Sequence, residues 1–153
     1  MRTFDPVLLA ALFLGAALPL HAQPSSFVMA ACGGETTTVA QVTLPHGVLA
    51  NGERLPAGRY ELRLTSQHPA AAPGVDPDAS CWMQFVRDGA VAGREVASVI
   101  PAAEIGRIAK TAPPARNSAR VDTLKDGDYL RIWINHDGTH YLLNLPADAP
   151  PRR

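Results

Sequence analysis

Alternating apolar residues mark two neighbouring strands within residues 126–146. Successive side chains of a strand point to opposite faces of a sheet, so residues two apart share a face. Asp137-Gly138 lies between the two runs and is typical of a two-residue type I′ hairpin turn. A three-residue turn would place Ile134 opposite His140 and split the apolar face, so the pattern favours the two-residue turn. The predicted pairs are Ile134 with Tyr141, Ile132 with Leu143, and Leu130 with Leu145.

The same alternation recurs upstream in shorter runs. Tyr60, Leu62 and Leu64 alternate with charged residues, which predicts a strand with one buried face and one face in water. Turn residues such as Asn51-Gly52 bound these runs, and the chain contains 14 prolines and 12 glycines. The pattern therefore predicts an all-β domain, a small antiparallel sandwich or barrel of six to eight strands with at most one short helix.

Two local features interrupt the strand pattern. Pro101 suits the first position of a helix, and Ile105 and Ile108 are spaced to share one helical face, so residues 102–110 are expected to form the short helix. Gly93 predicts a β-bulge in a long run of strand-forming residues.

The first residues have the features of a secretory signal peptide. Arg2 supplies a positive start, an apolar run covers residues 7–20, and Ala22 is the small residue before the expected cleavage point. The apolar run is shorter than the ~20 residues that span a bilayer, and no later segment is apolar enough, so we expect no membrane span. The expected organisation is a signal peptide over 1–22, an N-terminal segment over 23–34, one β-domain over 35–146 and a disordered tail over 147–153.

The chain has two cysteines, Cys32 and Cys81, both downstream of the predicted signal peptide. In an oxidising compartment two such cysteines are expected to form a disulfide. From the length of the loop that it closes, this disulfide should stabilise the folded state by about 4 kcal/mol. This favours an exported protein, periplasmic or extracellular. As an alternative, Met29-Ala30-Ala31-Cys32 resembles a bacterial lipobox, which implies a lipid anchor at Cys32. The two interpretations exclude each other, because a lipidated Cys32 could not bond Cys81.

A proline turn followed by the start of a strand occurs at Leu55-Pro56-Ala57-Gly58-Arg59-Tyr60. It resembles the L-P-A-G-x-Y element of many small exported bacterial β-domains. It is also similar to a turn and strand of transthyretin-like and carboxypeptidase-regulatory-like modules. The resemblance implies a small β-sandwich or barrel and implies no catalytic residue.

His136, Asp137 and His140 form the sharpest cluster of potential metal ligands, since His and Asp both bind zinc or copper. On the predicted hairpin, however, His136 pairs with Thr139 and His140 pairs with Asn135. The two histidines then point to opposite faces, which favours solvated histidines beside a turn. A metal-binding protein using these three residues is the alternative function.

Trp133, Tyr129 and Arg131 lie together on the face of the hairpin opposite its apolar residues. This mixture of residues suits a binding surface for a carbohydrate or a protein partner. A second layer could instead cover this face and bury Trp133 in a sandwich core, and the pattern favours that burial.

Charge and local motifs exclude several classes of function. The 14 basic residues balance the 14 acidic residues and form no basic run, so we expect no nucleic-acid partner. The local signatures of serine hydrolases, zinc proteases, thiol oxidoreductases and P-loop proteins are missing. The sequence therefore predicts an exported, non-enzymatic binding or cell-envelope-associated domain without a cofactor.

Overall fold

The computed structural model describes residues 32, 34–70, 73–74, 76 and 79–149. The predicted signal peptide, residues 23–31 and residues 150–153 lie outside this part of the chain. The elements of the described part, in chain order, are β1 (Thr37–Leu44), β2 (Val48–Ala50), β3 (Glu53–Leu55), β4 (Gly58–Leu64), β5 (Ser80–Arg87), β6 (Ala90–Ile100), α2 (Ala102–Ile108), β7 (Ser118–Leu124), η2 (Lys125–Gly127), β8 (Tyr129–His136) and β9 (Thr139–Pro146).

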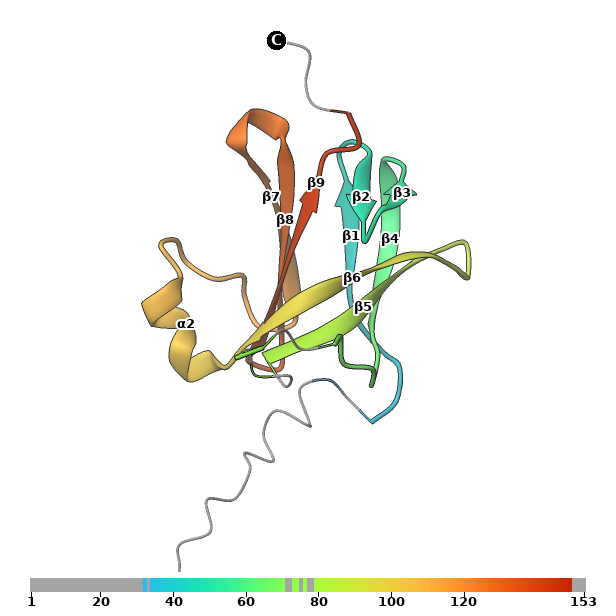
Figure 1. The fold of residues 1–153 in the computed structure, drawn as a ribbon. Helices are drawn as coiled ribbons and strands as arrows, with labels where there is room; N and C mark the ends of the chain where they lie inside the picture. Colours follow the sequence, from blue (N-terminus) through green and yellow to red (C-terminus); the bar gives the residue numbers. More distant parts are fainter. Residues whose placement is uncertain (1–31, 33, 71–72, 75, 77–78, 150–153) are drawn as a thin grey trace, which may run out of the picture.

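Seven strands form one antiparallel sheet in the order β1-β4-β5-β6-β9-β8-β7, and this sheet is nearly barrel-shaped (Figure 1). Strands β2 and β3 form a separate hairpin that packs against β6 and β9. The barrel falls into two groups of strands, β1-β4-β5-β6 and β9-β8-β7. These groups are joined by a short ladder in which Ser98, Val99 and Ile100 pair with Leu142, Tyr141 and His140. The predicted all-β antiparallel class is confirmed, and of the two predicted forms the structure is nearer to a barrel.

The hairpin β8–β9 has the predicted register throughout. Ile134 pairs with Tyr141, and His136 with Thr139, across the two-residue turn. Both turn residues have positive φ, 51° at Asp137 and 91° at Gly138, as a type I′ turn requires. The six apolar residues of the predicted face are all buried, so this hairpin supplies one wall of the core.

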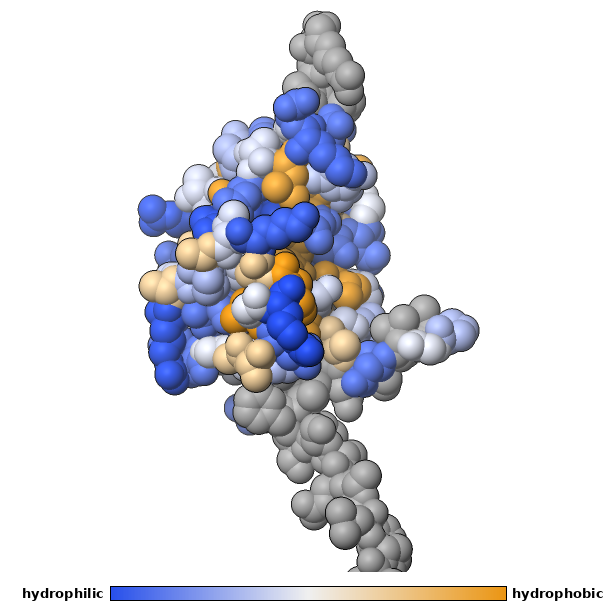
Figure 2. All heavy atoms as spheres, turned by 90° about the vertical axis from the view of Figure 1, so that its left-hand side faces the viewer, coloured by the Kyte–Doolittle hydropathy of each residue, from blue (hydrophilic) through white to orange (hydrophobic). Residues whose placement is uncertain are grey.

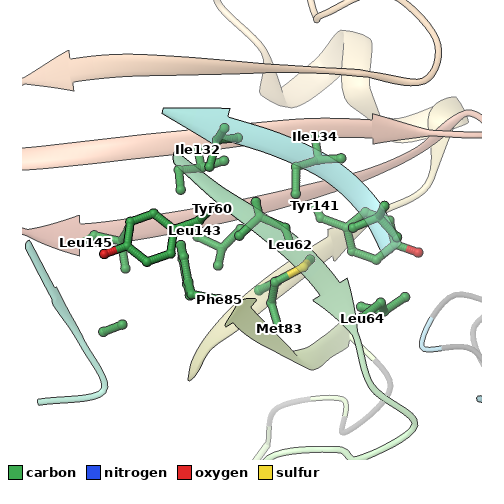
Figure 3. Packing of buried hydrophobic residues seen from close by; sticks show 14 of the residues in the cluster. Tyr60, Leu62, Leu64, Met83, Phe85, Ile132, Ile134, Tyr141, Leu143 and Leu145 are labelled. Atoms are coloured by element: carbon green, nitrogen blue, oxygen red, sulfur yellow. The ribbon is translucent and has the colours of Figure 1, made fainter. Parts of the chain in front are cut away.

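The core fills the interior of the barrel, where the apolar faces of β4, β5, β8 and β9 meet (Figure 3). The rings of Tyr60 and Phe85 pack edge to face with centroids 6.0 Å apart. The Tyr60 hydroxyl donates a hydrogen bond to the Pro56 carbonyl at 2.8 Å, which fastens the turn to the strand that follows it.

The bulge predicted at Gly93 is present in the β5–β6 ladder. Phe85 pairs with Gly93 but the next residue, Val86, pairs with Val91, so β6 carries one extra residue. A Cβ atom at position 93 would lie 3.1 Å from Leu55 Cδ2. A glycine at this position therefore lets the β2–β3 hairpin pack closely on the barrel.

A disulfide joins Cys32 to Cys81 on β5, with Cα atoms 5.5 Å apart, as predicted. The bridge is typical of an oxidising, exported environment. Because the Cys32 sulfur is bonded to Cys81, it is not free to carry the lipid of the alternative interpretation. Among the described residues, no helix is long and apolar enough to cross a membrane.

The β-domain extends slightly beyond its expected end at residue 146. The Ala147 amide donates to the Asp128 carbonyl at 2.8 Å, and the Asp148 amide donates to the Gly47 carbonyl at 3.0 Å. Asp148 also forms an ion pair with Arg54 at 2.9 Å. The first residues of the expected tail are therefore held against the β2–β3 hairpin.

Candidate functional site

Trp133 points outward from β8 but is only 3% exposed. Its partners across the ladders are Arg120 on β7 and Leu142 on β9. The Arg120 guanidinium carbon lies 5.2 Å from the indole centroid, within range of a cation–π contact. The indole is therefore flanked on both sides and does not form the open platform on which a sugar ring would stack. The burial of Trp133 that the sequence favoured is confirmed.

His140 packs against the edge of the same indole. The Trp133 Nε1–H group donates a hydrogen bond to His140 Nδ1 at 3.1 Å, and the ring centroids are 5.9 Å apart. His140 is 3% exposed, so the expectation that it is a solvated histidine beside the turn is wrong. This burial lowers the pKa of its imidazole. Neutral His140 thus accepts through Nδ1 and carries its proton on Nε2.

The layer that covers Trp133 is not a second sheet but the segment between β6 and β7, which contains α2 and the link of residues 109–117. Arg120 fastens this link, because its Nη1 donates to the Ala112 carbonyl at 2.9 Å and its Nη2 donates to the Thr111 hydroxyl at 3.2 Å. Farther along, the Asn135 amide donates to the Pro114 carbonyl at 2.9 Å. The link is therefore held to the outer face of β7 and β8.

Helix α2 stands off the sheet and leaves a hollow of about 350 Å³, which we call the α2 groove. No residue of α2 is buried, although Ile105 and Ile108 share the side that lines the groove. Figure 2 shows the face that carries α2, where hydrophobic residues gather at the centre and hydrophilic residues surround them. The groove is lined by Ile100, Ile105, Ile108, Ala109, Lys110, Thr111, Arg131, Trp133 and Leu142.

The lining is apolar at the helix and along β9, and cationic at Lys110 and Arg131. A shallower depression continues along β7 and shares Thr111 and Arg131 with the α2 groove. Asp122 borders this second depression, where it forms an ion pair with Arg120 at 2.9 Å. The site therefore offers apolar walls beside two positive charges.

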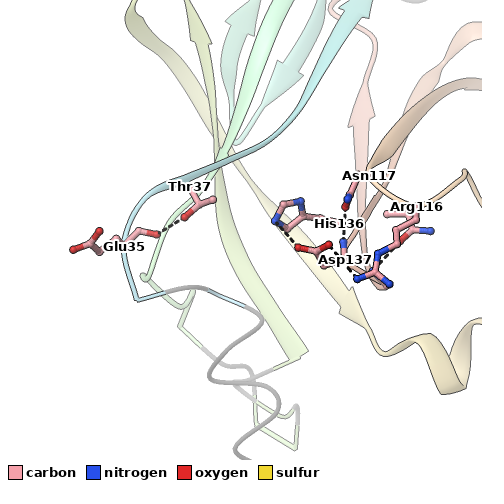
Figure 4. Close-up of polar contacts among 8 residues, drawn as sticks. Glu35, Thr37, Arg116, Asn117, His136 and Asp137 are labelled. Carbon is pink, nitrogen blue, oxygen red and sulfur yellow. Dashed lines mark hydrogen bonds and ion pairs between the residues drawn. The ribbon is translucent and has the colours of Figure 1, made fainter.

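The turn that carries the predicted metal ligands is organised as a local polar cluster (Figure 4). Asp137 Oδ1 lies 3.2 Å from Arg116 Nη2, and this hydrogen bond is the main reason why the pKa of Asp137 is lowered. The Asp137 amide donates to Asn117 Oδ1 at 2.8 Å. His136 Nε2 lies 3.9 Å from Asp137 Oδ2, whereas His140 is bonded to Trp133.

The structure therefore does not bring His136, Asp137 and His140 together around one point. Within the described residues, no group of three His, Cys, Asp or Glu side chains could hold a metal ion. The positive Arg116 beside the Asp137 carboxylate would also repel a cation at this turn.

Of the three residues predicted for a binding surface, Trp133 and Arg131 line the α2 groove. Tyr129 does not; it is 36% exposed, and Lys125 Nζ lies 4.9 Å from its ring centroid. The residues predicted for a site did not include Ile105 and Ile108, which also line the groove. Their shared helical face was the available signal, but nothing local indicated what that face would meet.

No protein-family model, curated protein or solved structure matches this chain. The assignment of a function therefore depends on the geometry and chemistry of the α2 groove.

Proposed function

We propose that this protein is an exported, non-enzymatic binding domain whose ligand site is the α2 groove. The observation that carries the proposal is a hollow of about 350 Å³ whose apolar lining includes Ile105, Ile108 and Leu142. Small-molecule sites have volumes of roughly 300–1,000 Å³ and combine apolar walls with a few placed polar groups. The Cys32–Cys81 disulfide supports an exported location.

The site suits a small-molecule ligand better than a protein partner that binds through a broad surface. The groove is a local hollow beneath one short helix, and its floor at Trp133 is held in place by the neighbouring strands. A rigid floor avoids part of the ordering cost of binding. Helix α2 forms one wall of the groove and has no buried residue, so it can adjust to a ligand without disturbing the core.

Binding of the neutral apolar dye N-phenyl-1-naphthylamine, followed by its fluorescence, tests this site. The dye should bind the native protein, and Ile108→Ser should weaken its binding about tenfold by removing an apolar wall. Because Ile108 is 53% exposed, the substitution should leave the thermal stability of the barrel unchanged.

Val91→Ser is the matched control. Val91 is 55% exposed and lies in β6 near the β5–β6 turn, outside the α2 groove, so its replacement should leave dye binding unchanged. The proposal is wrong if the folded protein does not bind the dye, or if the two variants weaken binding equally.

A further inference from the structure

Two cations line the α2 groove, and none of its nine lining residues is acidic. Arg131 is half-buried on β8, and its Nε donates to the neutral amide oxygen of Asn144 at 3.2 Å. Lys110 follows α2 and is exposed. Within the described part of the chain, neither Lys110 nor Arg131 forms an ion pair with a carboxylate, so the groove keeps an uncompensated positive charge.

The acidic residue that pairs with Arg131 in the sheet and the acidic residue of α2 are both engaged elsewhere. Asp122 pairs with Arg131 in the β7–β8 ladder, but its carboxylate forms an ion pair with Arg120. Glu104 on α2 lies 3.9 Å from Arg107 of the same helix. The indole N–H of Trp133 is donated to His140, and the other polar group of the groove is the Thr111 hydroxyl, which accepts from Arg120 and can donate its own proton. Lys110, Thr111 and Arg131 can therefore each donate a hydrogen bond to an anion.

Apolar and cationic surfaces meet in one hollow, so the complementary ligand joins an aliphatic chain to an anionic group. The volume of about 350 Å³ has room for a single short chain. Arginine and lysine both bind carboxylates, and the planar guanidinium can bind one through two parallel hydrogen bonds.

We infer that the ligand of the α2 groove is a medium-chain fatty acid, whose chain lies against Ile105, Ile108 and Leu142 and whose carboxylate binds Lys110 and Arg131. The inference rests on the proposed function, because it names the ligand class of the same groove. Binding requires no covalent step and no cofactor.

Displacement of N-phenyl-1-naphthylamine by three probes, each built on a chain of ten carbons, tests the inference. The probes are decanoate, decanol and decyltrimethylammonium, which share their chain and differ in the charge of the head group, used below the concentrations at which they form micelles. Decanoate should displace the dye at a concentration about tenfold lower than decanol does, and the ammonium compound should be the weakest.

Charge-removing variants locate the head group. Lys110→Gln and Arg131→Gln should each weaken decanoate binding about fivefold and leave the affinity for the dye and for decanol unchanged. Arg107→Gln is the control, because it removes a positive charge from α2 at a residue that does not line the groove. It should leave the displacement by decanoate unchanged.

The possible outcomes separate the two proposals. If the dye binds but decanol or the ammonium compound displaces it as well as decanoate does, the groove is a binding site and the fatty-acid inference is wrong. An equal loss of decanoate affinity in Arg107→Gln would also overturn it, since general charge would then explain the effect. If the dye does not bind, the proposed function fails and the inference fails with it.

Discussion

Trp133 and His140 form a buried hydrogen bond beneath the α2 groove. Trp133 needs an acceptor for its indole N–H group, and Nδ1 of neutral His140 provides one at 3.1 Å. Protonation would convert that acceptor into a donor and would place a charge in a residue that is 3% exposed. The protonation state of one histidine therefore affects the packing under the α2 groove.

We expect the free energy of unfolding to decrease as the pH falls below the ordinary histidine pKa of about 6.5. Burial lowers the pKa of His140 in the folded state, so between the two pKa values the unfolded chain binds a proton and the folded chain does not. Above this window the residue is neutral in both states and contributes no pH dependence. Urea unfolding at several pH values between about 7.5 and 4.5, a range that includes the ordinary histidine pKa, measures the effect.

His140→Gln should remove this part of the pH dependence while lowering stability at neutral pH through the altered contact with Trp133. His136→Gln is the control, because His136 is half-exposed on the same hairpin and does not bond Trp133. The same pH profile in native protein and His140→Gln would show that His140 is not responsible.

At the scale of elements, the segment between β6 and β7 determines whether a groove exists. Its link is held to the sheet through Arg120, which bonds the Ala112 carbonyl, the Thr111 hydroxyl and the Asp122 carboxylate while covering Trp133. Helix α2 has no buried residue of its own, so the position of the helix depends on these contacts.

Arg120→Gln should loosen the link and lower the free energy of unfolding by about 1 kcal/mol, because the hydrogen bonds are partly exposed. Trp133 should become more accessible to the quencher acrylamide. The chain has two tryptophans, so quenching is measured in a Trp82→Phe background. Arg59→Gln is the control, because Arg59 is an exposed arginine of β4, and it should leave the quenching unchanged. If quenching of Trp133 is also unchanged in Arg120→Gln, Arg120 does not hold the link over Trp133.

The elements differ in how far the sequence predicts them. The register of β8–β9 could be predicted, because Asp137-Gly138 fixes the turn and the alternation allows one pairing. The groove could not be predicted in the same way. Ile105 and Ile108 were expected on one face of a helix, but the surface that this face meets is set by contacts distant in sequence, such as that of Asn135 with Pro114.

At the scale of the whole molecule, the choice between sandwich and barrel was also beyond the sequence. It depends on the pairing of β6 with β9, which covers only residues 98–100 and 140–142 and has no local turn to specify it. The Cys32–Cys81 pair could be proposed from composition and export alone, because no other cysteine competes.

The short β6–β9 ladder pairs two continuous pieces of chain, residues 37–100 and 118–146. The only covalent connection between these two pieces is the segment that carries α2. No sheet ladder includes a residue of α2 or of the link. Cleavage of the backbone within α2 would therefore break no strand pairing.

We expect a protein cleaved at an inserted protease site after Gly106 to remain a folded pair of fragments, held by the shared core and the β6–β9 ladder. Native mass spectrometry would detect the pair at neutral pH, and separation into two unfolded chains would contradict this expectation. Because no strand pairing includes this segment, substitutions and insertions there could change the ligand over the course of evolution while the barrel stays the same.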